Sequence, residues 1–183
     1  MVETLTPAAI TARVIEHFPA VTPFPVLDGV ACLLVPANQM LALATFVRDA
    51  TDLAFDSLMD VAGLDLMKYP GEKKGEFPST DLAVVLHLHS FTHRHHLRLR
   101  IILPRDNPTL PSVVGLWPVA NLFEREIFDL FGVTFTHHPD LRRILLPEDW
   151  IGHPLRKDYV YPTIYNDVAL KRDGQRFSEG PYA

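Results

Sequence analysis

The chain has 183 residues, of which 48% are hydrophobic and 21% are charged, a composition typical of a folded globular domain. Its 22 acidic and 17 basic residues give a net charge of −5, so nothing favours a general attraction to nucleic acid. The single cysteine, Cys32, cannot form an internal disulfide or supply the several thiolates of an iron–sulfur cluster. The apolar runs are short and interrupted, and the sequence therefore predicts neither a signal peptide nor a membrane span.

The N-terminal part alternates helical and extended patterns. Apolar residues at four-residue spacing over 7–18 predict a short amphipathic helix. The compact apolar run 30–35 predicts a strand, and the spacing over 40–48 predicts a second helix. The segment 55–65 fits either period, and Gly63 favours a strand with a kink or bulge at that glycine.

A β-hairpin is predicted where apolar residues alternate strictly over 82–88 and again over 97–103. The stretch 70–80 carries the glycines, prolines and charges of a loop. This order of elements predicts an α+β fold, with helices packed on a mostly antiparallel sheet in a ferredoxin-like variant. We expect a globular domain over 1–133, followed over 134–183 by an extended arm that docks on a partner, because that part has no sustained period.

A third helix is predicted to begin at Asn121, which forms a capping-box pattern with Glu124, and to end at Gly132 in a left-handed conformation. The charged residues of this helix, Glu124, Arg125 and Asp129, are predicted to point away from its apolar face. Arg125 and Asp129 are four residues apart, so they could form an ion pair. The apolar face is formed by Phe123, Ile127, Leu130 and Phe131.

Three carboxylates on this helix, Glu124, Glu126 and Asp129, are candidates for acid–base chemistry if burial raises the pKa of one of them. The favoured interpretation is structural. Glu124 and Glu126 in the first turn complement the helix dipole, and they could pair with Arg125 or with Arg142 and Arg143 downstream.

Histidines are a second candidate group. Residues at alternate strand positions point the same way, so His87 and His89 could share a metal ion. The same face would also carry Arg98 and Arg100, whose charges oppose a divalent cation, and surface histidines are therefore the favoured interpretation. The whole group consists of His87, His89, His93, His95 and His96.

The sequence contains no G-x-G-x-x-G dinucleotide motif, no P-loop and no G-x-S-x-G nucleophile motif. Cys32 lies in an apolar run, where a thiol is usually an inert packing group. We therefore predict no catalytic, cofactor-binding or metal-binding residues within the chain.

The most specific pattern is EREIFDLFG at 124–132, followed by HPDLRRIL at 138–145, PEDW at 147–150 and GHPLRKDY at 152–159. This block closely resembles the C subunit of bacterial NADH-quinone oxidoreductase, respiratory complex I, and Asp60, Gly63 and Asp65 resemble the upstream pattern of that family. The matching positions that we assign to the family signature and to an interface are Glu124, Arg125, Glu126, Asp129, Gly132, His138, Pro139, Asp140, Arg142, Arg143, His153, Pro154, Arg156, Lys157, Asp158 and Tyr159.

The resemblance implies a cofactor-free subunit of the hydrophilic arm, docked beside the D subunit near the quinone site, with FMN and iron–sulfur clusters in partner subunits. It implies a complex that couples NADH oxidation and quinone reduction to proton translocation. It also implies indirect membrane association, through that complex, on the cytoplasmic side of the bacterial inner membrane. The charges of the block would hold the proline-rich segment in place or meet charges on the partner.

Two alternatives stay open. The first is an equivalent scaffold role in a related hydrogenase or plastid-type dehydrogenase complex, which the neighbouring subunits would distinguish. The second is an independent metalloenzyme built on the histidine group, which metal analysis would test.

Overall fold

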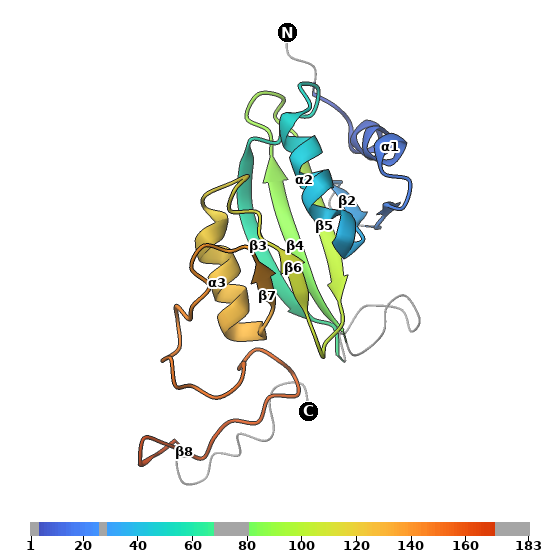
Figure 1. Cartoon of the computed structure of the whole chain (residues 1–183). Helices are drawn as coiled ribbons and strands as arrows, with labels where there is room; N and C mark the ends of the chain where they lie inside the picture. Colours follow the sequence, from blue (N-terminus) through green and yellow to red (C-terminus); the bar gives the residue numbers. More distant parts are fainter. Residues whose placement is uncertain (1–3, 26–28, 68–80, 171–183) are drawn as a thin grey trace.

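The computed structural model describes residues 4–25, 29–67 and 81–170, so the predicted loop 70–80 lies outside the described residues. The elements follow one another along the chain as shown in Figure 1. They are α1 (Pro7–His17), β1 (Thr22–Pro23), β2 (Ala31–Leu34), a 3-10 turn η1 (Ala37–Gln39), α2 (Met40–Asp49), β3 (Ser57–Asp65), β4 (Leu82–His89), β5 (His96–Leu103), β6 (Thr109–Pro111), α3 (Ala120–Phe131), β7 (Thr134–Thr136), β8 (Ile164–Tyr165) and β9 (Val168–Ala169).

The main sheet has the strand order β1-β2-β5-β4-β3. Strands β3, β4 and β5 form an antiparallel meander, and β5 returns beside β2, to which it is parallel. The hairpin register joins Leu82 to Leu103 and His89 to His96. The predicted α+β class, with helices on a mostly antiparallel sheet, is confirmed, and this strand order defines the variant.

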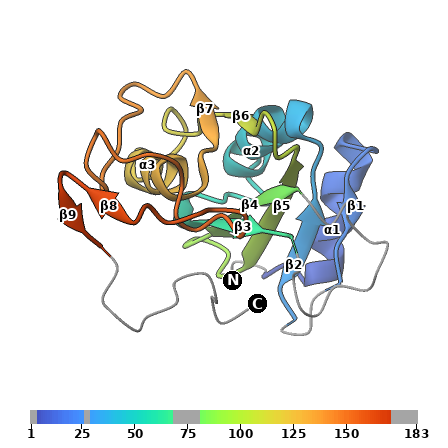
Figure 2. The same cartoon turned by 90° about the horizontal axis from the view of Figure 1, so that it is seen from below.

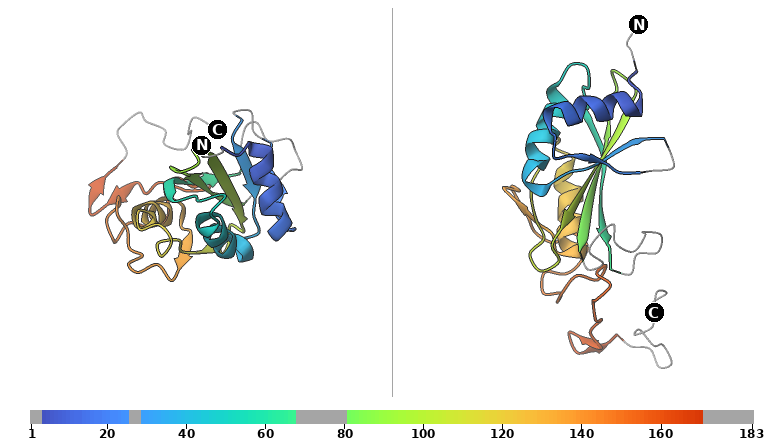
Figure 3. Two further views of the ribbon diagram at one scale, coloured as in Figure 1. Left: turned by 90° about the horizontal axis from the view of Figure 1, so that it is seen from above. Right: turned by 90° about the vertical axis from the view of Figure 1, so that its right-hand side faces the viewer.

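The core lies on the face of the sheet that α2 and α3 cover (Figures 2 and 3). Leu86 of β4 and Leu99 of β5 are buried there, because alternate residues of a strand point to the same face. Helix α1 packs beside β2 at the sheet edge and buries Ile10 and Val14 in the same core.

The segment 55–65 forms a strand, as predicted, but the irregularity lies between Leu58 and Asp60 rather than at Gly63. Gly63 pairs regularly with Val84 and faces α3. A Cβ atom at Gly63 would lie 2.6 Å from a ring carbon of Phe131. The glycine is therefore needed for the close approach of the helix to the sheet, and a kink is not its role.

The start of α3 also differs from the prediction. Its N-cap position is Val119, which has no side-chain cap, and the prediction of a capping box at Asn121 is wrong. The turn before the helix already supplies carbonyl acceptors, because the Ala120 and Asn121 N–H groups donate to Trp117 and Pro118. The predicted helix end is confirmed, because Gly132 has φ 71° and ψ 30° in the left-handed region.

The contact between Gly63 and Phe131 gives a stability test. Gly63→Ala should lower the free energy of unfolding by about 1–3 kcal/mol, because the added methyl forces the Phe131 ring or α3 to move. Urea denaturation of the purified chain measures this. Gly115→Ala is the matched control, because a Cβ there meets nothing within 4 Å. Equal stability of the Gly63 variant and the wild type would refute the close-approach role.

Candidate functional site

The Asp129 carboxylate of α3 is fully buried and accepts hydrogen bonds from the irregular segment 143–146. Its Oδ1 accepts from Arg143 Nη1 at 2.7 Å. Its Oδ2 accepts three successive backbone N–H groups, from Ile144, Leu145 and Leu146, at 3.0, 2.8 and 2.9 Å. Burial alone would raise the pKa of Asp129, but these backbone donors and Arg143 outweigh it and hold the pKa below its usual value.

Two arginines extend the same network. Arg143 Nη2 donates to the carbonyl oxygens of Trp150 and Gly152, at 2.9 and 3.1 Å. Arg125 donates to the carbonyl oxygens of Arg142 and Arg143, at 3.1 and 3.2 Å. The predicted Arg125–Asp129 ion pair is therefore wrong. The side chains of Arg125 and Arg143 donate to backbone carbonyl oxygens of a segment that has no regular hydrogen bonding of its own.

The last carbonyls of α3 find donors in the segment 153–156. His153 Nδ1 lies 2.9 Å from the Asp129 carbonyl oxygen, and the Leu155 N–H donates to Leu130 at 3.1 Å. Arg156 Nε donates to the Phe131 carbonyl oxygen at 2.6 Å. A cationic group at this end also complements the helix dipole. The segment thus caps the helix.

Gly132 stands at the centre of this cap. A Cβ atom at this position would lie 2.5 Å from the His153 ring and 2.9 Å from Arg156 Nη2, so the glycine is required by space as well as by its positive φ. Burial lowers the pKa of His153, with the positive charges of Arg156 and Arg143 adding to the effect. His153 is therefore a neutral hydrogen-bonding group at pH 7.

A second anchor lies at the end of β3. Asp65 is 6% exposed, forms an ion pair with Arg105, and accepts the Lys157 N–H at 2.8 Å. Arg105 also pairs with Asp158 at 2.9 Å. Arg105, just beyond β5, was missed by the sequence reasoning, because a single arginine after a strand carries no pattern.

The remaining signature residues either lie at the surface or make hydrogen bonds that hold neighbouring turns together. Arg142 and Asp140 form an ion pair at 2.9 Å, with side chains 62% and 52% exposed. His138 Nε2 lies 3.3 Å from the Asn121 carbonyl oxygen, and the Tyr159 hydroxyl donates to Ile151. The residues left outside these contacts are Glu126 and Pro139, which are exposed, and Pro154, which is half-buried.

Glu124 differs most from its prediction. It is 1% exposed, its Oε1 accepts the Val113 N–H at 2.7 Å, and its Oε2 has no hydrogen-bond partner within the described part of the chain. Burial raises the pKa of Glu124 to about 7, partly offset by the Ser112 hydroxyl and the Val113 N–H. The predicted outward position and the pairing with Arg142 or Arg143 are wrong. Ala120, Glu124 and Ile127 share one buried face of α3 at helical spacing.

The histidine group divides into two kinds. The rings of His93 and His95 bind the carbonyl oxygens of Thr51 and Leu53, at 2.8 and 2.7 Å, and so attach the hairpin turn to the α2–β3 connection. His87 faces Arg98 across the hairpin, as predicted. Over residues 4–25, 29–67 and 81–170, no three potential ligands gather to form a metal site.

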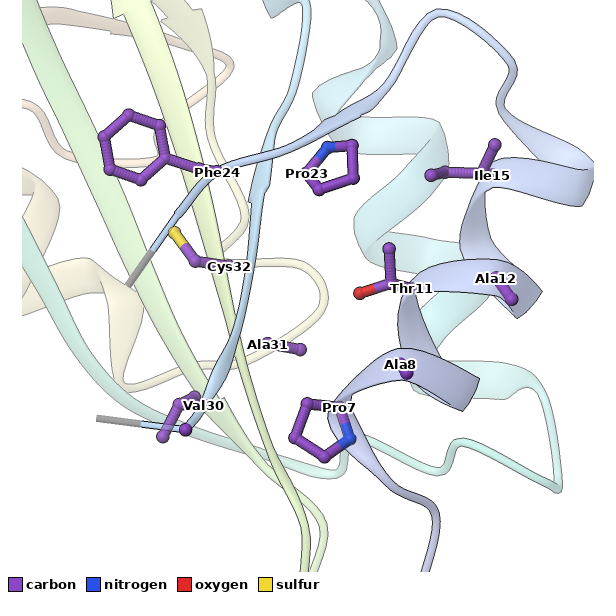
Figure 4. Close-up of a pocket in the computed structure, with 11 residues that line it drawn as sticks. Pro7, Ala8, Thr11, Ala12, Ile15, Pro23, Phe24, Val30, Ala31 and Cys32 are labelled. Atoms are coloured by element: carbon purple, nitrogen blue, oxygen red, sulfur yellow. The ribbon is translucent and has the colours of Figure 1, made fainter. Parts of the chain in front are cut away.

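An open pocket of about 590 Å³ lies at the other edge of the sheet, between α1 and the strands β1 and β2 (Figure 4). Its lining is apolar or weakly polar, with Ala8 and Ile15 on one side and Phe24 and Cys32 on the other. The described residues of the lining include no acid, no base and no charged group.

The signature residues, by their hydrogen bonds, form an internal scaffold that holds an irregular segment against α3.

Two solved structures share this fold. The chain is similar to a trypsin-resistant fragment (1-134) of Nqo5, with a TM-score of 0.53, 29% identity and coverage of 71% of this chain and 98% of that one. Its fold also matches a chain of an archaeal membrane-bound sulfane sulfur reductase, with a TM-score of 0.65, 21% identity and coverage of 82% and 84%.

Sequence comparison gives the family. The model of the respiratory-chain NADH dehydrogenase 30 Kd subunit matches residues 33–164, and the chain belongs to this family. It is 43% identical over 163 residues to the NADH-quinone oxidoreductase C subunit of Herpetosiphon aurantiacus, covering 89% of this chain and 88% of that protein. It is 42% identical over 178 residues to the C subunit of a Roseiflexus species, covering 94% and 96%. In the part of the chain that the structure describes, no helix is long and apolar enough to cross a bilayer.

The buried Glu124 generates a pH prediction. Its pKa is 4.5 in the unfolded chain and about 7 in the folded one, so the folded state holds a proton that the unfolded state releases. Stability from this group is complete below the unfolded pKa and is lost as pH rises through the folded pKa. Glu124→Gln, which imitates the protonated acid, should therefore gain up to about 3 kcal/mol over the wild type between about pH 5 and pH 8.

Urea denaturation of both proteins across this pH range measures the difference. Glu126→Gln is the control, because Glu126 lies exposed on the same helix. Parallel stability curves for Glu124→Gln and the wild type would contradict the raised pKa.

Proposed function

We propose that this chain is a cofactor-free structural subunit of an NADH-quinone oxidoreductase, docked on the D subunit beside the quinone site. In this proposal FMN and iron–sulfur clusters belong to partner subunits, and the complex couples NADH oxidation and quinone reduction to proton translocation. The chain associates with the cytoplasmic side of the inner membrane only through the complex. The observation that carries the docking role is an array of exposed apolar side chains on the irregular residues 138–168, which we call the signature segment.

These apolar side chains point outward although backbone N–H groups of some of the same residues bind inward. Leu145 is 61% exposed although its N–H binds Asp129, and Leu155 is 50% exposed although its N–H caps α3. Farther along, Ile151 and Val160 are 82% and 85% exposed. An apolar array of this kind on a fixed backbone is typical of a surface that a partner protein covers. The whole array consists of Ile144, Leu145, Ile151, Leu155, Val160, Tyr161, Ile164 and Val168.

The position of the segment suits docking. It runs along the outer side of α3, and β8 and β9 lie beyond that helix, away from the main sheet (Figures 1 and 2). The Arg142–Asp140 ion pair is exposed within the same segment. Protein interfaces combine apolar with charged and polar residues, and this segment exposes both kinds. The segment thus offers a partner a preformed surface at one end of the molecule.

A non-catalytic role is supported by how the polar residues are used. Asp129, Arg143, His153 and Arg156 direct their hydrogen-bonding groups to partners within the chain, most of them backbone groups. A catalytic group must instead reach a substrate, usually from a cleft. The pocket beside α1 lies at the opposite edge of the sheet, and its described lining has no charged group.

Docking can be tested by placing charge on the array. Ile151→Glu combined with Val160→Glu should leave the isolated chain folded, because both side chains are more than four-fifths exposed. In membranes, the variant should be retained poorly in the assembled complex, because a carboxylate is costly to bury at an interface. Quinone reduction should fall only in proportion to assembly.

The matched control is Phe91→Glu, because Phe91 is 70% exposed on the hairpin turn, outside the array. Arg143 would be a poor probe, since its replacement breaks the internal network. Normal assembly of the double variant would refute the docking surface. Normal assembly with activity lost would place these residues at the quinone chemistry instead.

A further inference from the structure

One cross-strand histidine pair has no part in the internal contacts described above. His89 ends β4 and His96 begins β5, directly opposite each other in the register. Their ring centroids are 4.5 Å apart, with 33° between the ring planes. In the adjacent pair, the Ser90 N–H donates to His95 at 3.0 Å. Because hydrogen-bonded and non-hydrogen-bonded pairs alternate, His89 and His96 occupy the non-bonded kind, in which side chains come closest.

The two rings are accessible to an ion from solvent. His96 is exposed and His89 is half-buried. Within the described residues, neither ring takes part in a hydrogen bond, whereas His93 and His95 are held by the carbonyl oxygens of Thr51 and Leu53. These two anchors fix the turn between the strands, so the pair is held in place at little entropic cost.

The spacing matches a shared metal ion. Imidazole nitrogens bind zinc at about 2.0–2.1 Å, so two of them in a tetrahedral site are about 3.3 Å apart. The ring centres are 4.5 Å apart, which brings both imidazoles within reach of one ion. The third neighbour in the same row of the sheet is Ser57, opposite His89, and its small side chain leaves room for water ligands.

Two charged side chains lie near the pair. Arg98, two residues along the same strand, opposes a cation. The Asp56 carboxylate, which accepts the Phe91 N–H at 3.1 Å, brings a negative charge to this end of the sheet.

We propose that His89 and His96 form a two-imidazole site for one divalent transition-metal ion of the zinc, copper or nickel type, with water at the remaining positions. Imidazole ligands select these metals over magnesium or calcium, which prefer oxygen. The site lies at the turn end of the β4–β5 hairpin, and metal binding stabilises the folded chain. It is independent of the signature segment, which lies on α3.

Calorimetric titration of the full chain with zinc chloride tests the site. The wild type should bind one zinc ion per chain, and the affinity should fall by about tenfold or more in His89→Gln and in His96→Gln, because each removes one of two ligands. The melting temperature should rise with zinc in the wild type and not in these variants. His137→Asn is the control, because His137 is exposed, outside the hairpin, and has the positive φ that asparagine tolerates.

Electron paramagnetic resonance of the wild-type chain with copper(II) keeps the test independent of how the variants fold. Two coordinated imidazole nitrogens are expected in the wild type and one in each single variant that is folded by circular dichroism. Zinc affinity unchanged in both variants would overturn the proposal, and so would a wild-type copper spectrum with a single nitrogen. Loss of binding in His137→Asn equal to that in the hairpin variants would also overturn it.

Discussion

The buried carboxylate of Asp129 is the interaction on which the rest of the structure depends. Between β7 and residue 170, the segment forms neither a helix nor a long strand, so its backbone groups need partners that regular structure does not supply. Asp129 provides an acceptor for three of its N–H groups, and Arg143 and Arg125 provide donors for its carbonyl oxygens. In return, residues 153–156 satisfy the last carbonyls of α3. Helix and segment therefore complete each other's hydrogen bonding.

This reciprocal arrangement places α3 between two surfaces. One side of the helix packs on the sheet, where Gly63 permits the approach of Phe131. Another side is covered by the segment, where Gly132 permits the approach of His153. Backbone groups of the segment are used at this inner contact, and the side chains of Leu145, Ile151, Leu155 and Val160 are left exposed. The docking surface that we propose is thus a consequence of how the segment is held.

Much of the sheet could be predicted from sequence, because strict alternation over β4 and β5 reports one buried face directly. The left-handed end of α3 at Gly132 was also predictable, since a glycine after the last apolar residue has few other roles. The inward positions of Glu124 and Asp129 were not. The prediction treated α3 as buried on one side only, and a helix covered on two sides has no exposed face for these charges.

In the candidate site, too, some features could be predicted from the sequence and others could not. The residue types of the signature were readable, but the contacts of Arg125 and Arg143 with backbone carbonyls were not, because such partners leave no mark in a sequence pattern. Asp65 was singled out from its resemblance to the family, while its partner Arg105 carried no signal. Sequence patterns report periodic burial, and an irregular segment has no period to report.

Amide hydrogen exchange at Ile144, Leu145 and Leu146 tests the central claim most directly. The account predicts slow exchange at these three amides in the wild-type chain, although they lie outside any helix or strand, because each N–H is held by a buried carboxylate. In Asp129→Ala the three amides should exchange as fast as the exposed neighbour Glu148, while Ile127 within α3 stays protected. Exchange at Ile144, Leu145 and Leu146 as fast as at Glu148 in the wild type would contradict the account.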